Sequence, residues 1–389
     1  MTEPSEPKES GDASNGAQGD DDRGIRVTLA TQNLQGGGWG GSCLAYDFDR
    51  LPLFIERLKP VEADILVVNE VRDRRAWRPG ELRLRTPVEH EIDDRERLAA
   101  LGSALGLQFV GITPSKTGNP TAVLCRRERF ADVSWDADYS EALFTNGCGV
   151  ARFSFPDTKR RLAVAAIHAS EWSELRTTEE LQTAVSLVCQ RSSWAVVAGS
   201  LNCPPVYGPS AIEPLMPAHH RMNHLTGAGG SGTIGSNLRP QQTLADAGFV
   251  DVAEVLGACE QAPGETFSKL VNRCLTSKAG RMDRVHVSDL LADAPVEYRL
   301  LNEPSGAAEH HGVAVTLDLS RARARSSWIT EWPKRMMRDL ANDMFPEGGF
   351  DQFRREVLAA VPAHQRAELD RKLSAISGLI YEERPADAL

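Results

Sequence analysis

The spacing of apolar residues changes several times along the chain and predicts a protein of mixed strands and helices. β-Branched residues alternate with others over residues 25–34, and residues 63–71 are nearly all apolar, so both segments are predicted strands. Between them, residues 48–60 carry apolar side chains at helical spacing and stop at Pro60, which predicts a helix. Strand, helix and strand therefore follow one another from residue 25 onward.

The same patterns continue to residue 319 and predict a layered fold. Helices are predicted at 95–106, 177–191 and 244–256; the second would begin with Thr178 as its N-cap, and the third would run into a turn. Eight or more strands, several of them apolar on both faces, indicate two sheets covered by helices. The further strands are predicted at 109–112, 121–127, 150–155, 161–170, 194–202, 282–288 and 313–319.

Both ends of the chain differ from this central part. Residues 1–23 contain no aromatic or branched aliphatic residue, so they cannot bury enough surface to fold and are predicted to be disordered. Residues 320–389 contain no convincing strand, and we expect three parts: an acidic tail (1–23), an α/β domain (24–319) and a helical C-terminal module (320–389). The spacing predicts helices of this module near 332–344, 351–360 and 363–378.

Two interpretations of the C-terminal module stay open. Its apolar residues at helical spacing suit a small module that packs on the α/β domain. The same residues also suit a module that docks a protein partner.

The negative charge of the chain is concentrated at its N-terminus. The chain has 44 Lys and Arg against 54 Asp and Glu, a net charge of −10. Seven acids and one base within the first 22 residues account for −6 of this charge and leave −4 for the remainder. Proteins that coat nucleic acid without specificity carry a basic surplus. The balance therefore argues against a packaging protein, but not against an enzyme with a local basic rim.

Cysteine use and hydropathy indicate a cytoplasmic protein. The seven cysteines are scattered and contain no C-x-x-C pair, which predicts reduced thiols and argues against a structural zinc site. No run of about 18 apolar residues is present, and the N-terminus is acidic and polar rather than signal-like. We therefore expect neither a membrane span nor secretion.

The polar residues that could carry chemistry fall at the ends of the predicted strands. In layered α/β folds, strand ends place ligand-binding side chains on a rigid frame. Six separate strand ends offer such residues, which predicts that they gather in one site. These residues are Asn33, Glu70, His168, Ser200 with Asn202, Asp283, and Glu309 with His310.

Six short sequence motifs, called words below, resemble in sequence and in order those of the endonuclease/exonuclease/phosphatase superfamily, the relatives of DNase I and exonuclease III. The resemblance spans residues 24–319 and implies an α/β fold, a DNase I-like sandwich of two sheets in four layers, followed by the helical appendage. The words are VTLATQNL (27–34), ADILVVNEV (63–71), AVAAIHAS (163–170), VVAGSLNCPP (196–205), GRMDRVHVS (280–288) and AEHHGVAVTLDL (308–319).

The resemblance implies a divalent metal site at the ends of the first two words. Glu70 would bind Mg²⁺ or Mn²⁺, and Asn33 would lie beside it. Glu309 stands where the family has Asp before its histidine. Glu309 keeps the charge but adds a methylene group, which would move a metal contact by about 1 Å.

Catalytic roles are implied for His310, Asp283, Asn202 and His168. Asp283 would accept a hydrogen bond from His310 and favour its protonated ring, which would offer a proton to a phosphate oxygen. Asn202 and His168 would donate hydrogen bonds to the same phosphate. A satisfied core histidine is the alternative for His168.

Ser200 departs from the family pattern, which has Asp at this position of its G-D-x-N word. That Asp is proposed to activate or orient the attacking water. Serine cannot act as a base near neutral pH without a base of its own. General-base assistance contributes roughly 10²–10⁴-fold to a rate, so the sequence predicts a slow or an inactive enzyme.

The expected function is a metal-dependent phosphoester hydrolase, a phosphodiesterase or nuclease, with a phosphate-containing substrate such as DNA or RNA. The alternative is an attenuated or inactive member that binds a phosphate ligand or a partner. Residues 72–78 (RDRRAWR) would contact a phosphate backbone or form a solvated basic loop. Residues 204–240 would form a lid or a loop that selects the substrate.

Overall fold

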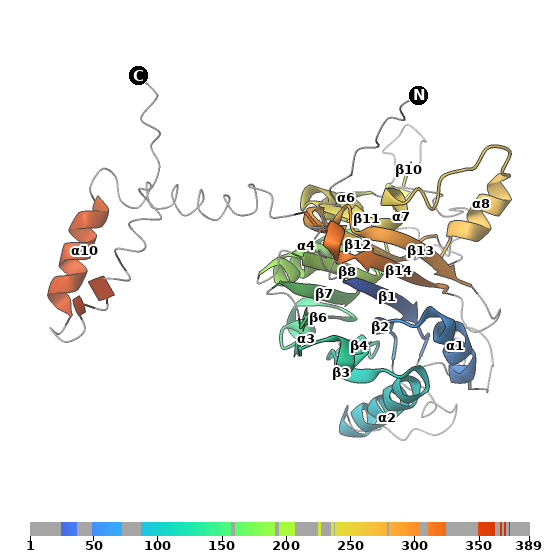
Figure 1. The fold of residues 1–389 in the computed structure, drawn as a ribbon, viewed down its shortest axis with the longest axis horizontal. Coiled ribbons are helices and arrows are strands. Elements are labelled where there is room, and N and C mark those ends of the chain that lie inside the picture. The colour runs from blue at the N-terminus through green and yellow to red at the C-terminus, as the bar shows by residue number, and fades with distance from the viewer. Residues whose placement is uncertain are drawn as a thin grey trace, which may run out of the picture.

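Two six-stranded sheets dominate the molecule (Figure 1). Neither the acidic tail predicted for residues 1–23 nor the loop 72–78 lies within the residues that the structure describes. Of the segment 204–240, short pieces alone are described. The computed structural model describes residues 25–36, 49–71, 87–156, 160–190, 194–206, 225–226, 235–236, 238–277, 280–302, 310–323, 349–361, 366–367, 369–370 and 373.

The first sheet is built around a parallel pair, β1 (Arg26–Asn33) and β2 (Ile65–Asn69). All of its other neighbours are antiparallel, and its order is β13-β14-β1-β2-β4-β3. The remaining strands are β3 (Gln108–Ile112), β4 (Ala122–Cys125), β13 (Pro295–Leu301) and β14 (Gly312–Asp318). β1 and β2 are buried on both faces, as their apolar sequences predicted.

The second sheet repeats this plan around the parallel pair β7 (Arg161–His168) and β8 (Trp194–Ser200). Its order is β11-β12-β8-β7-β6-β5, again with antiparallel neighbours outside the central pair. The remaining strands are β5 (Asp132–Asp136), β6 (Gly147–Ser154), β11 (Phe249–Asp251) and β12 (Asp283–Ser288).

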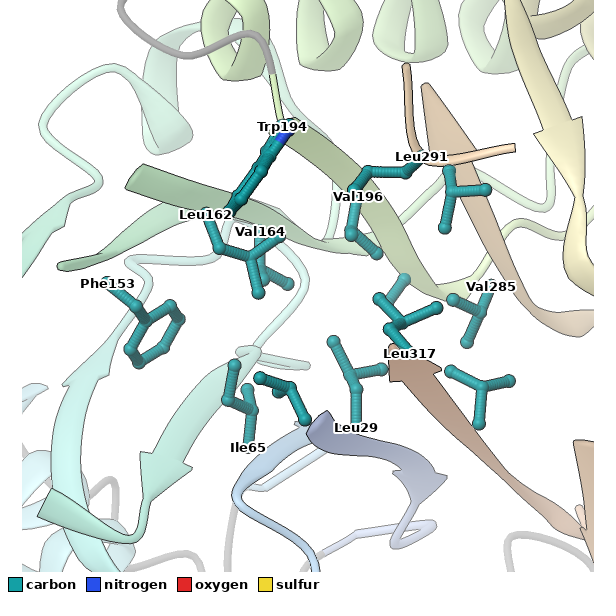
Figure 2. Close-up of a cluster of buried hydrophobic side chains, with 14 of the residues drawn as sticks. Leu29, Ile65, Phe153, Leu162, Val164, Trp194, Val196, Val285, Leu291 and Leu317 are labelled. Carbon is teal, nitrogen blue, oxygen red and sulfur yellow. The ribbon is translucent and has the colours of Figure 1, made fainter. Parts of the chain in front are cut away.

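The inner faces of the two sheets meet in one apolar core. Figure 2 shows Leu29 and Leu317 of the first sheet facing Val164 and Val196 of the second. The neighbouring residue Ala30 belongs to the cluster on the outer face, as the alternation of side chains along a strand requires. Burial of this core holds the two sheets together and fixes the relative positions of their strand ends.

Helices cover the outer face of each sheet. α1 (Leu51–Leu58) and α2 (Pro87–Leu105) pack on the first sheet, and α4 (Glu174–Cys189) and α6 (Arg239–Asp246) pack on the second (Figure 1). The arrangement is a four-layer α/β sandwich, which confirms the predicted fold class.

Two details of the predicted helices are wrong. The N-cap of α4 is Ser173, whose Oγ accepts from the Arg176 amide, whereas Thr178 lies inside the helix and donates to the Glu174 carbonyl. The segment 244–256, predicted as a short helix followed by a turn, contains the end of α6, then β11, and then α7 (Val252–Val255). Gly248, with a φ of 77°, ends α6 and turns the chain into that strand.

The pattern analysis also missed several elements. β5 and β13 are edge strands whose polar and apolar residues are mixed, so their burial signal is weak. Three further elements are short: α3 (Ser140–Leu143), α8 (Phe267–Cys274) and the ribbon of β9 (Leu225–Thr226) with β10 (Gly235–Ser236).

In the C-terminal part, the structure describes α10 (Gly349–Ala360), close to the helix predicted at 351–360. Val357 and Leu358 of α10 pack with Leu369 and Leu373 in a small cluster of their own. The helix predicted at 332–344 lies outside the described residues, as does most of 363–378. Of the helices that the structure describes, none has the length and apolar character needed to cross a membrane.

Candidate functional site

The ends of the central strands in both sheets meet at one edge of the sandwich. In the first sheet, Asn33 at the end of β1 is in register with Asn69 at the end of β2. In the second sheet, Ser200 at the end of β8 is in register with both His168 of β7 and Asp283 of β12. Because the sheets are packed face to face, these side chains come together although they are far apart in the sequence.

Hydrogen bonds join these strand ends into one line that crosses from sheet to sheet. His310 Nδ1 lies 2.7 Å from Asp283 Oδ2, and Ser200 Oγ donates to Asp283 Oδ1 over 2.5 Å. The amide nitrogen of Asn33 contacts Ser200 Oγ at 3.4 Å and Glu70 Oε1 at 2.9 Å. The structure thus brings His310 and Glu70, at opposite ends of the line, into the same site.

Glu70 stands where the chain leaves β2. Its φ of 53° is in the left-handed region, an uncommon conformation for a residue with a Cβ, which turns its side chain out of the strand direction. His168 Nε2 lies 4.0 Å from Glu70 Oε1. Glu70 Oε2 accepts no hydrogen bond from any described residue, so this carboxylate keeps one oxygen for a ligand.

His310 and Asp283 form a dyad that is buried at one end and open at the other. The Asp283 side chain is fully buried, whereas that of His310 is 20% exposed. Burial acts to raise the pKa of Asp283, but the adjacent His310 and the hydroxyl of Ser200 outweigh it and hold this pKa below its ordinary value. Asp283 is therefore ionised and fixes the orientation of the His310 ring.

The backbone of His310 is also anchored. Its carbonyl accepts from Arg57 Nη1 at 3.2 Å and from Gln32 Nε2 at 3.3 Å. The same Arg57 nitrogen donates to Gln32 Oε1 at 3.2 Å, and both side chains are buried. β1 and α1 therefore hold the segment that carries the histidine.

His168 and Asn202 lie on the side of the site formed by β7 and β8. His168 is buried, and its Nδ1 has no hydrogen-bond partner among the described residues. Asn202 has a φ of 48°, and its amide donates to the carbonyl of Ala169, the residue after His168, over 2.8 Å. His168 is thus buried, as expected of a core histidine. Its ring nevertheless lies next to the Glu70 carboxylate.

Asn69 is a site residue that sequence reasoning missed. Its amide nitrogen donates to the Ile167 carbonyl of the other sheet at 3.0 Å and to Thr121 Oγ1 at 2.9 Å. Its amide oxygen accepts from the backbone nitrogen of Ser200 at 3.1 Å. Asn69 therefore fastens β2 to β7 and β8 directly beneath the site. Its one sequence signal is its place immediately before Glu70.

The oxygen atoms available in the site fit a weakly held hard cation. Asn33 Oδ1 accepts from the Gln35 amide, and both carboxylate oxygens of Asp283 are engaged, which leaves Glu70 as the carboxylate with a free oxygen. Mg²⁺ is commonly held by one or two carboxylates, with water and substrate phosphate completing its shell. Among the described residues, no group of three or more His, Cys, Asp or Glu could hold a metal ion, and Glu309 lies outside them.

Comparisons with known proteins gave matches to solved structures alone. No family model and no curated protein matches the chain. An endonuclease/exonuclease/phosphatase protein from Beutenbergia cavernae is similar over 75% of this chain and 71% of its own, with 16% identity and a TM-score of 0.44. The 3′ phosphatase NExo from Neisseria, bound to a product DNA hairpin, is similar over 75% of this chain and 99% of its own, with 17% identity and a TM-score of 0.46.

An AP endonuclease from Archaeoglobus fulgidus gives the same figures as the Neisseria phosphatase: 17% identity, coverage of 75% and 99%, and a TM-score of 0.46. These likenesses concern the fold. The four-layer sandwich carries at its strand ends the six words that resemble those of the endonuclease/exonuclease/phosphatase superfamily.

Proposed function

We propose that this protein is a divalent-metal-dependent phosphoester hydrolase that acts on a phosphodiester, with nucleic acid as the leading substrate class. The observation that carries the proposal is the line of hydrogen bonds from His310 through Asp283, Ser200 and Asn33 to Glu70. It sets an oriented imidazole and a carboxylate with a free oxygen on the two sides of one site.

Glu70 is the residue that would hold Mg²⁺ or Mn²⁺, and Asn33 would fix its carboxylate through the 2.9 Å hydrogen bond. When bound, such an ion would polarise the phosphoryl group and lower the pKa of water. The His168 ring, 4.0 Å from Glu70, adds a hydrogen-bond donor on the same side. The left-handed turn at Glu70 would aim the carboxylate at the substrate.

The dyad would act on the phosphate from the other side. Asp283 holds Nδ1 of His310, so the opposite ring nitrogen is the one that faces substrate and carries a proton toward a phosphate oxygen. Asn202 would add an amide hydrogen bond. Because Asp283 is already engaged by two donors, it would act as a positioning residue rather than as a base.

Ser200 limits the expected rate. Its hydroxyl donates to Asp283, so it is oriented as a donor and offers no basic oxygen to a water molecule. A missing general base lowers rates by roughly 10²–10⁴-fold. We therefore expect a hydrolase of low turnover.

The same serine favours a second candidate, a protein that binds a phosphate ligand without turnover. The groups that recognise phosphate and cation would remain, while the group that activates water would be absent. Such a protein would bind a phosphate ligand at this site and contact a protein partner through the C-terminal module (320–389). For either candidate, we propose that the protein is cytoplasmic.

The two candidates are separated by assays with Mg²⁺ or Mn²⁺ on single- and double-stranded DNA, on RNA and on a chromogenic phosphodiester. Hydrolysis that is lost in Glu70→Ala and His310→Ala, retained in the exposed control Glu96→Ala and raised in Ser200→Asp supports the enzyme. Saturable binding with no hydrolysis, even in Ser200→Asp, supports the binding protein. Hydrolysis that persists in both Glu70→Ala and His310→Ala would refute the proposed site.

A further inference from the structure

The chain between α8 and β12 turns back toward the His310–Asp283 dyad. Ser277 and Gly280 exchange backbone hydrogen bonds: the N–H of Ser277 donates to the Gly280 carbonyl at 2.9 Å, and that of Gly280 donates to the Ser277 carbonyl at 3.1 Å. The hydroxyl of Ser277 also donates to the Gly280 carbonyl at 3.1 Å. This turn sets Thr276, the fully buried residue before it, beside Asp283 at the start of β12.

The hydroxyl of Thr276 holds the backbone of Asp283. Its Oγ1 accepts the N–H of Asp283 at 2.9 Å and donates its own hydrogen toward the Gly280 carbonyl at 3.4 Å. A hydroxyl has one hydrogen to donate and two lone pairs that accept, so the two contacts are compatible. Because Asp283 is fully buried, its N–H needs an acceptor, and Thr276 supplies it. The hydroxyl therefore fixes the point from which the Asp283 carboxylate extends.

The carbonyl of Thr276 holds the other member of the dyad. It accepts the N–H of His311 at 2.6 Å. That N–H belongs to the same planar peptide group as the carbonyl of His310. The carbonyl end of this group accepts from Arg57 and Gln32, at 3.2 Å and 3.3 Å. The peptide group that follows His310 is thus held at both ends, which fixes the point from which the imidazole extends.

The dyad joins two residues that are 27 positions apart, and Thr276 is hydrogen-bonded to the chain at both places. His310 Nδ1 lies 2.7 Å from Asp283 Oδ2. Hydrogen bonds from N–H to oxygen extend over roughly 2.7–3.2 Å, so separating the two segments by a further ~1 Å would break this bond. A displacement of about 1 Å is also large on the scale of catalytic geometry. The two contacts of Thr276 oppose such a displacement.

We propose that Thr276 is a positioning residue of the dyad, whose hydroxyl and carbonyl together set the distance between Asp283 and His310. Thr276 acts through these two residues, since its hydroxyl and its carbonyl are both bonded to backbone groups. The positioning does not depend on a substrate. Its effect on turnover, by contrast, rests on the proposed function.

The test is NMR of the full-length protein with ¹⁵N-labelled histidine rings at one fixed pH, in which His310→Gln identifies the His310 signals. Thr276→Val exchanges the hydroxyl for a methyl group and leaves the carbonyl in place. We expect the His310 ring signals to shift, because Asp283 loses the acceptor of its N–H and moves relative to the ring. The amide proton of Asp283 should shift upfield for the same reason. Thr276→Ser keeps a hydroxyl acceptor, so its spectra should match those of the wild type.

Ser288→Ala is the matched control at the opposite end of β12. The hydroxyl of Ser288 accepts the buried backbone N–H of Ala195 at 3.3 Å, so this variant also removes the acceptor of a buried N–H. Its His310 ring signals should stay at their wild-type positions. Equal shifts in Ser288→Ala and Thr276→Val would show a general loss of packing and would overturn the proposal. Wild-type His310 signals in Thr276→Val would overturn it as well.

Hydrogen exchange in the wild-type protein tests the proposal even if Thr276→Val does not fold. The amides of Asp283 and His311 should both be strongly protected, because each is bonded to Thr276. Rapid exchange at either amide would overturn the proposal. Where the protein hydrolyses a phosphodiester, Thr276→Val should lower kcat by up to about 100-fold with little change in KM, and Thr276→Ser should restore it. The NMR and exchange measurements need no turnover, so their failure is distinct from failure of the proposed function.

Discussion

The hydroxyl of Ser200 and the carboxylate of Asp283 share a hydrogen bond of 2.5 Å between two fully buried side chains. Asp283 holds His310 with its other oxygen, so the serine is an integral partner of the dyad. A serine in this position offers no base and at the same time supplies a neutral donor that stabilises the Asp283 charge. Stability and rate therefore change in opposite directions at this residue.

Ser200→Ala should destabilise the protein. The variant leaves Asp283 Oδ1 buried without its hydroxyl donor, and a hydrogen bond to a charged group contributes about 1.5–3 kcal/mol. Urea unfolding at neutral pH measures the loss. Ser186→Ala is the matched control, because that hydroxyl also donates a hydrogen bond but lies exposed on α4. Equal stability losses in the two variants would contradict the role given to Ser200.

Ser200→Asp should make the protein depend on a divalent cation for stability. The new carboxylate would lie beside Asp283, and two buried like charges repel unless a cation or a proton compensates them. We expect Mg²⁺ to raise the melting temperature of Ser200→Asp by more than it raises that of the wild type.

Ser200→Asn is the control for the shape of the new side chain, since it introduces a similar volume without charge. Its response to Mg²⁺ should match that of the wild type. If Ser200→Asp and Ser200→Asn respond alike, then no cation binds near this position and the proposed metal site is wrong.

The sequence was sufficient to predict a two-sheet fold and its central strands, because strands such as β2 and β8 are apolar on both faces. Asn69 could not be predicted in the same way. Its importance lies in contacts with Ile167 and Ser200, which belong to the other sheet, and no local pattern encodes a partner so far along the chain. The roles assigned to the site residues stay predictions.

The misplaced N-cap of α4 has a similar physical cause. Ser173 and Thr178 are both residue types that cap helices, so composition does not choose between them. The choice depends on where β7 ends and how the chain turns. Glu180, buried in α4, accepts from the Ser170 amide at 2.7 Å and so fixes the start of the helix close to Ser173.

Gly199→Ala should disrupt the pairing of β8 with β7 at the centre of the second sheet. A Cβ at Gly199 would lie 2.0 Å from the Ile167 carbonyl oxygen, and the φ of 135° is itself unfavourable for alanine. We expect a loss of about 3 kcal/mol in the free energy of unfolding. Gly264→Ala is the control: its φ of 76° is also positive, but no atom lies within 4 Å of the added Cβ.

The control should therefore show the cost of the backbone conformation alone, about 1–2 kcal/mol. Denaturant unfolding of both variants gives the comparison. Should Gly264→Ala be the more destabilised variant, the close approach of β8 to β7 at Gly199 would not be what requires glycine at this position.

His286 should make the protein less stable as the pH falls below neutrality. Its ring is fully buried on β12, and burial lowers its pKa to about 3; Asp251 opposes this shift, while Arg284 and Arg281 add to it. The folded-state pKa is thus below the unfolded value of about 6.5. Between these two values the unfolded chain binds a proton that the folded chain does not.

Stability linked to His286 is therefore complete above about pH 6.5 and decreases by about 1.4 kcal/mol for each pH unit below it, until the pH nears the folded-state pKa. Urea unfolding of the wild type and of His286→Gln between pH 7.5 and pH 5 measures the difference, and the variant should show a smaller decrease. The His286 ring resonances, followed by NMR in the folded protein, should not titrate over this range. A ring that titrates near its ordinary pKa while the protein stays folded would show that burial does not keep His286 neutral.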